Sequence, residues 1–70
     1  MAYEVWEMRS GNLVASFGTE AAALGLVRDA LEAQGEEYGR HLALVREDDD
    51  GTSTAVAMGD RLLERVRVPA

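Results

Sequence analysis

One stretch of the chain, residues 19–34, has the hydrophobic pattern of an amphipathic α-helix and constrains the fold more than any other feature. Its larger apolar residues share one helix face: Leu24, Val27 and Leu31. Thr19 is a favourable N-cap residue, and Gly35 suits the position just beyond a helix end. Gly25 lies inside this helix, where it is either a close packing contact or a tolerated defect that costs about 1 kcal/mol relative to alanine.

The segments on either side of this helix have the composition of β-hairpins. Alternating or β-branched runs predict four strands, Tyr3–Met8, Leu13–Phe17, His41–Arg46 and Thr52–Met58. Glycine-containing turns join the strands of each pair. A short helix beginning at Asp60 would carry Leu62, Leu63 and Val66, and Pro69 would end the ordered part of the chain. The sequence therefore predicts one α+β domain spanning residues 1–70. Its four-stranded antiparallel sheet, in the order β-β-α-β-β, carries one long helix on one face, and a short C-terminal helix follows.

The alternation in the first hairpin predicts which side chains share a face. If Gly11 occupies a bulge after a type I turn, Val5 lies opposite Ala15 and Trp6 opposite Val14. This register places Leu13 on the helix-covered face, with Tyr3, Val5, Ala15 and Phe17.

One helix covers only one face of such a sheet, so the second face is expected to carry uncovered apolar residues. The candidate interface residues are Trp6, Met8, Val14, Val45 and Val56. An uncovered apolar patch usually marks a contact surface, so we predict a homodimer formed by sheet packing or by strand pairing. The alternative is that Leu62, Leu63 and Val66 fold over this second face and complete a monomer.

Length and cysteine content support the need for a partner. A chain of 70 residues is marginally stable unless a disulfide, a metal or a second subunit helps it. It has no cysteine and a single histidine, His41, which excludes disulfides, thiolate metal sites and histidine-rich metal sites. Oligomerisation or unusually good packing remains.

The charge balance is acidic. Seven basic residues, all arginine, oppose thirteen acidic ones, for a net charge of −6. This charge should repel nucleic acid and suits a basic protein partner. No apolar run is long enough to cross a membrane, and the first residues lack a signal-peptide pattern. We therefore expect a cytoplasmic protein, and the absence of lysine beside abundant Ala, Gly, Val and Glu suggests a bacterial source.

Two clusters could carry chemistry, and both have simpler explanations. Asp48-Asp49-Asp50-Gly51 offers carboxylates to a hard cation, but the calcium-loop spacing fails, and Asp-Gly is a preferred hairpin turn. His41 could act as a general base, but no nucleophile is specified near it, which favours a histidine at a strand edge. We expect no catalytic, metal or cofactor site.

The hairpin and the helix entry together resemble known small domains. The segments concerned are Tyr3-Glu4-Val5-Trp6, Ser10-Gly11-Asn12-Leu13-Val14 and Phe17-Gly18-Thr19-Glu20-Ala21-Ala22. They resemble small uncharacterised bacterial domains in which a hairpin leads through a Thr-Glu-x-Ala cap into a helix and a second hairpin. The helix entry is also similar to antitoxin partners of bacterial RNA-cleaving toxins. The resemblance implies the fold and assigns no functional residue.

Three functions are consistent with these observations. The first is a non-enzymatic protein–protein interaction module, homodimeric and able to bind a basic partner. The second is an acidic antitoxin or inhibitor that neutralises a basic protein. The third is a small enzyme or metal binder that uses His41 and the turn at Asp48–Asp50.

Overall fold

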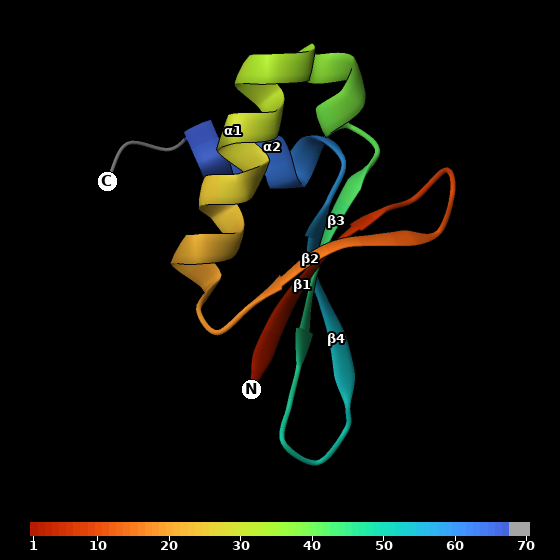
Figure 1. Cartoon of the computed structure of the whole chain (residues 1–70), viewed down its shortest axis with the longest axis vertical. Coiled ribbons are helices and arrows are strands. Elements are labelled where there is room, and N and C mark those ends of the chain that lie inside the picture. Colours follow the sequence, from red (N-terminus) through yellow and green to blue (C-terminus); the bar gives the residue numbers. More distant parts are fainter. Residues whose placement is uncertain (68–70) are drawn as a thin grey trace.

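The computed structural model describes residues 1–67 and contains four strands and two helices (Figure 1). In chain order they are β1 (Ala2–Glu7), β2 (Asn12–Phe17), α1 (Glu20–Gly39), β3 (Leu42–Glu47), β4 (Ser53–Met58) and α2 (Asp60–Arg67). The predicted α+β class with a four-stranded antiparallel sheet is confirmed. The predicted end at Pro69 lies outside the described residues.

The sheet has the strand order β2-β1-β3-β4, and every neighbouring pair is antiparallel. Each hairpin therefore joins adjacent strands, and α1 makes the connection between the two hairpins. The two central strands pair Val5 with Leu44, and Leu44 in turn pairs with Ala57 on β4. These three side chains share one face because directly opposed residues project to the same side of a sheet.

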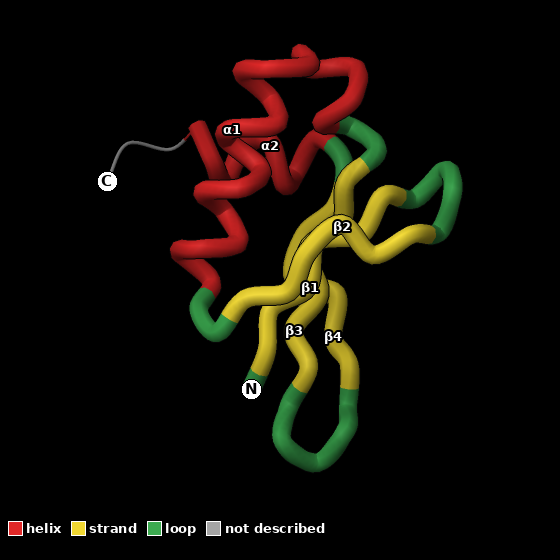
Figure 2. The backbone as a smooth tube through the Cα atoms, in the orientation of Figure 1, coloured by secondary structure: helices red, strands yellow, loops and turns green. Residues whose placement is uncertain are grey.

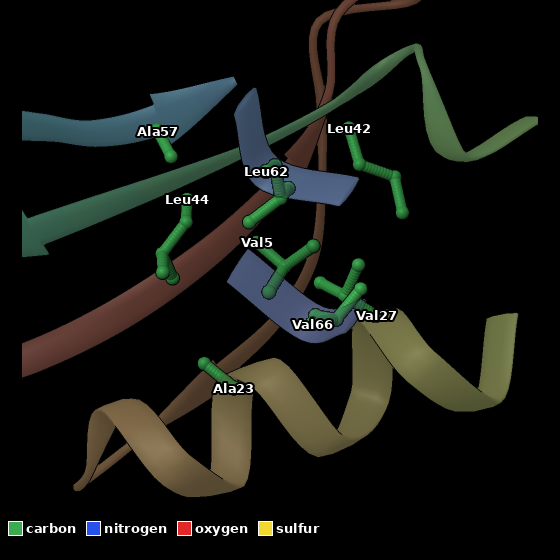
Figure 3. Close-up of a cluster of buried hydrophobic side chains, with 8 residues drawn as sticks. All are labelled: Val5, Ala23, Val27, Leu42, Leu44, Ala57, Leu62 and Val66. Atoms are coloured by element: carbon green, nitrogen blue, oxygen red, sulfur yellow. The ribbon is translucent and has the colours of Figure 1, made fainter. Parts of the chain in front are cut away.

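Both helices pack on that same face, and the figures show them together on one side of the strands (Figure 2). Leu62 and Val66 of α2 point into the cluster that contains Val27 of α1 and Val5 of β1 (Figure 3). All members of this core are at most 9% exposed: Val5, Ala23, Val27, Leu42, Leu44, Ala57, Leu62 and Val66. The hydrophobic core is therefore a single layer between the sheet and the two helices.

Capping chemistry sets the start of the long helix at Thr19 as predicted. The side chain of Thr19 accepts a hydrogen bond from the backbone N–H of Ala22 at 3.2 Å. Regular helical geometry is interrupted at Gly35, which adopts φ 85° and ψ 175°. The segment after it forms a further helical turn that ends at Gly39, beyond the helix end predicted at Gly35. An added Cβ at Gly39 would lie 2.8 Å from a terminal methyl of Leu63, so the two helices meet there at close range.

Helix α2 lies beside α1 rather than across the second face of the sheet. Its apolar residues are 0–7% exposed: Leu62, Leu63 and Val66. Two surface ion pairs accompany this packing: Arg65 lies 3.0 Å from Glu20 of α1, and Asp60 lies 3.0 Å from Arg40. The alternative in which these residues cover the second face is therefore wrong. The spacing of Leu62, Leu63 and Val66 in the sequence predicts one apolar stripe on α2 but not which face of the sheet this stripe contacts.

Each of the two edge strands contains a β-bulge. On β2 the pairing passes from Val5–Ala15 to Trp6–Leu13, which leaves Val14 as the extra residue. On β4 it passes from Leu44–Ala57 to Val45–Ala55, which leaves Val56 as the extra residue. The predicted pairing of Val5 with Ala15 is confirmed. The predictions that Trp6 pairs with Val14 and that Leu13 faces the helices are wrong, because the inserted residue shifts the alternation.

Candidate functional site

The face of the sheet opposite the helices is the candidate site, and we call it the open face. Its members follow from the register and from the alternation of side chains along each strand. They are Ala2, Glu4 and Trp6 of β1, Leu13, Val14 and Ser16 of β2, Ala43, Val45 and Glu47 of β3, and Ser53, Ala55 and Met58 of β4. Met8 extends the face by one residue beyond β1, where its N–H donates to the carbonyl of His41 at 2.7 Å.

One apolar row crosses the open face through all four strands. Trp6 lies opposite Leu13 on one side and opposite Ala43 on the other, and Ala43 lies opposite Met58. Such cross-strand neighbours have Cβ atoms about 5 Å apart and form a continuous contact surface. The row therefore spans the full width of the sheet.

Large apolar side chains on this face are accessible. Met8 and Val14 are each 42% exposed, and Leu13 and Met58 are each 46% exposed. In the described part of the chain, Met1 is the single other large apolar residue of comparable exposure. Accessible apolar surface is thus concentrated on one face of the sheet. Exposed apolar residues without a common role are instead scattered singly over a protein surface.

Four of the five predicted interface residues lie on or beside the open face, and one does not. Trp6, Val14 and Val45 belong to it, and Met8 lies at its end. Val56, the bulged residue of β4, packs against the helix-side core. Sequence alternation missed Leu13 and Met58, because no residue pattern in the two edge strands marks where a bulge falls.

The charges on the open face are few and acidic. Among its described residues, Glu4 and Glu47 carry charge, and no arginine lies there. The indole N–H of Trp6 donates to the Glu4 carboxylate at 3.3 Å. This bond holds the carboxylate beside the ring and leaves its remaining acceptor capacity open to a donor from outside the chain.

A separate open hollow of about 300 Å³ lies between β4 and α2, and it is lined by Val56, Ala57, Arg61, Glu64 and Arg65. Arg65 is already paired with Glu20. Among these lining residues, the carboxylate of Glu64 is the one group of the kind that covalent catalysis uses, and no histidine lies beside it in the lining.

The two clusters with possible chemistry have partners within the chain. Asp50 accepts the backbone N–H of Thr52 at 2.9 Å, a bond that lowers the pKa of its carboxyl group. Gly51 adopts a positive φ of 87° in the same turn. The imidazole of His41 lies 3.5 Å from the Glu37 carboxylate and 30% of the side chain is exposed. The first arrangement is that of a hairpin turn, and the second is that of a surface histidine beside a carboxylate.

Within residues 1–67, no group of three metal-ligating side chains lies close enough together to hold an ion. In the same range, no helix combines the length and apolarity that crossing a bilayer requires. A scan against protein-family models and searches of curated proteins and of solved structures find no match to this chain. The geometry of the open face is therefore the observation from which function is argued.

Proposed function

We propose that this protein is a non-enzymatic protein–protein interaction module that self-associates through the open face of its sheet. The observation that carries the proposal is the uncovered apolar row Leu13–Trp6–Ala43–Met58. Both helices pack on the other side of the sheet, so no described segment of the chain shields this row.

The energy available from the face supports a weak dimer. Met8, Leu13, Val14 and Met58 are 42–46% exposed, and burying what remains is worth about 1 kcal/mol each. Two copies would together gain about 8 kcal/mol, against an association cost of about 4–15 kcal/mol. At the low end of that cost about 4 kcal/mol remains, so we expect a dissociation constant of about 1 mM.

Packing of faces is favoured over pairing of edges. Strands β2 and β4 are the two edges, and each carries a bulge. Bulges twist an edge strand and disrupt the regular spacing that pairing with another strand requires. The open face has no comparable obstacle.

Size-exclusion chromatography with light scattering measures the molar mass of the protein at loading concentrations from about 10 µM to about 1 mM and tests the proposal. Met58→Glu places a charge in the apolar row and should keep the protein monomeric throughout. Thr54→Glu is the matched control, because it adds the same charge at an exposed position on the other face of the same strand. A parent protein that stays monomeric at every load, or equal effects of the two substitutions, would contradict the proposal.

A second candidate function is inhibition of a basic protein, as an acidic antitoxin or inhibitor. The observation that favours it is that both charged residues of the open face, Glu4 and Glu47, are acidic, in a chain of net charge −6. A basic partner would supply the cation that the face lacks. This function would be supported if the parent protein captured a small basic protein from the native cell and the Glu4→Gln variant did not. Equal capture by both would oppose it.

The proposal also includes a cytoplasmic, bacterial setting and a protein rather than a nucleic acid as the partner. Small secreted domains commonly depend on disulfides, and this chain has no cysteine. The net negative charge is unfavourable for binding phosphate backbones.

A further inference from the structure

We infer that the second copy is related to the first by a two-fold axis that runs parallel to the strands, so that β1 and β2 of one copy pack on β3 and β4 of its partner. This inference rests on the proposed self-association and adds the orientation of the two faces. It follows from an asymmetry in the size of the side chains on the open face.

The bulky side chains lie on one half of the open face. Trp6, Leu13 and Val14 belong to β1 and β2, and Met8 lies at the end of the same hairpin. The other half, on β3 and β4, carries the small residues Ala43 and Ala55 beside Val45, with Met58 at the outer edge. Ala43, which is 5% exposed, lies between Trp6 and Met58 in the row.

Two orientations allow identical faces to meet about a two-fold axis aligned with the sheet. An axis across the strands would place β2 over β2 and β1 over β1, with bulky residues against bulky residues and a void over the alanines. An axis parallel to the strands places β1 over β3 and β2 over β4. Each Trp6 then lies over Ala43 of the other copy, and each Leu13 lies over Met58. Close-packed interfaces without voids require the second orientation.

The charges of the face are compatible with this arrangement. The second cross-strand row is Ser16–Glu4–Val45–Ala55. The axis along the strands places Glu4 over Val45 of the other copy, so the two Glu4 carboxylates are not directly opposed. The 3.3 Å bond from the Trp6 indole is retained within each copy. An isologous contact of this kind closes as a dimer, because each half of the face is occupied by its complement.

Thiol cross-linking tests the orientation directly, because the chain contains no cysteine. Leu13→Cys and Met58→Cys change two positions that are each 46% exposed, so both variants should fold. Within one chain they are separated by three strand spacings, about 14 Å. The probe is a bis-maleimide that spans about 10 Å, the separation of packed sheets. We expect a cross-linked dimer from an equimolar mixture of the two variants and at least five-fold less from either variant alone.

The next row supplies an independent pair, Ser16→Cys with Ala55→Cys, both at exposed positions. Light scattering on the same samples separates the two proposals. Monomers at every load would overturn the proposed function. Dimers that cross-link within a single variant, or that do not cross-link in either mixture, would overturn the orientation while self-association stands.

Discussion

The helical segment between the two hairpins contains glycines whose replacement by alanine should have opposite effects, and Gly25 is the most informative. Glycine in a helix interior is destabilising by about 1 kcal/mol relative to alanine. An added Cβ at Gly25 would meet no atom within 4 Å. This open space decides between the two interpretations of Gly25 in favour of a tolerated defect. Gly25→Ala should therefore raise the free energy of unfolding by about 1 kcal/mol, which corresponds to about 4–8 °C in Tm for a domain of this size.

Gly35→Ala is the control, because an added Cβ there also meets no atom within 4 Å, while φ is 85° and ψ 175°. This backbone conformation costs a residue with a side chain about 1–3 kcal/mol, against about 0.4–1 kcal/mol gained from a less flexible unfolded chain. Gly35→Ala should therefore lower Tm. Urea and thermal denaturation followed by circular dichroism, at one fixed protein concentration, measure both variants. If Gly25→Ala lowered Tm as well, the open space beside α1 would be occupied in solution and the reasoning would fail.

Three further predictions use the same denaturation assays. Leu44→Ala should lower the free energy of unfolding by about 2–5 kcal/mol because Leu44 is fully buried. Leu13→Ala should change the free energy of unfolding by less than about 1 kcal/mol in the monomer. Equal losses of stability in the two variants would mean that the bulge in β2 is misplaced. Gly39→Ala should lower Tm because its Cβ would lie 2.8 Å from buried Leu63, and an unchanged Tm would show that the contact relaxes. A hydrogen bond from the backbone N–H of Ser10 lowers the pKa of Glu7 below its usual 4.5. The ionised carboxylate therefore stabilises the fold above pH 4.5, and this contribution is lost as the pH falls through the lowered pKa. Glu7→Gln should lose less stability than the parent between about pH 6 and pH 3, and equal losses in the two proteins would contradict this.

Local chemistry accounts for the part of the fold that the sequence predicts well. The cap at Thr19 and the interruption at Gly35 each depend on the conformational preference of one residue and on hydrogen bonds to near neighbours. The pairing of Val5 with Ala15 follows from the alternation of the strands on either side of a glycine turn. These features need no information about distant parts of the chain, so a single sequence contains what is needed to predict them.

The position of α2 depends on contacts that the sequence pattern does not specify. Its apolar stripe could cover either face of the sheet with similar burial. The chain turns out of β4 at Gly59, which adopts a positive φ of 59° and accepts hydrogen bonds from the N–H groups of Leu62 and Leu63. Packing against α1 at Gly39 then fixes the helix on the covered side. A glycine indicates that such a turn is possible but not the direction in which the chain leaves it.

The two bulges explain why the open face is more apolar than alternation alone predicts. If Val14 paired regularly with Trp6, Leu13 would lie opposite Glu7 and face the helices. If Val56 likewise paired regularly with Leu44, Met58 would lie opposite Leu42 and face the helices. Each insertion therefore transfers one large apolar side chain from the covered side to the open face, and these two residues form the ends of the row through Trp6 and Ala43. A chain that needed burial alone would keep both residues in its core, so their transfer to the surface supports the self-association proposed above.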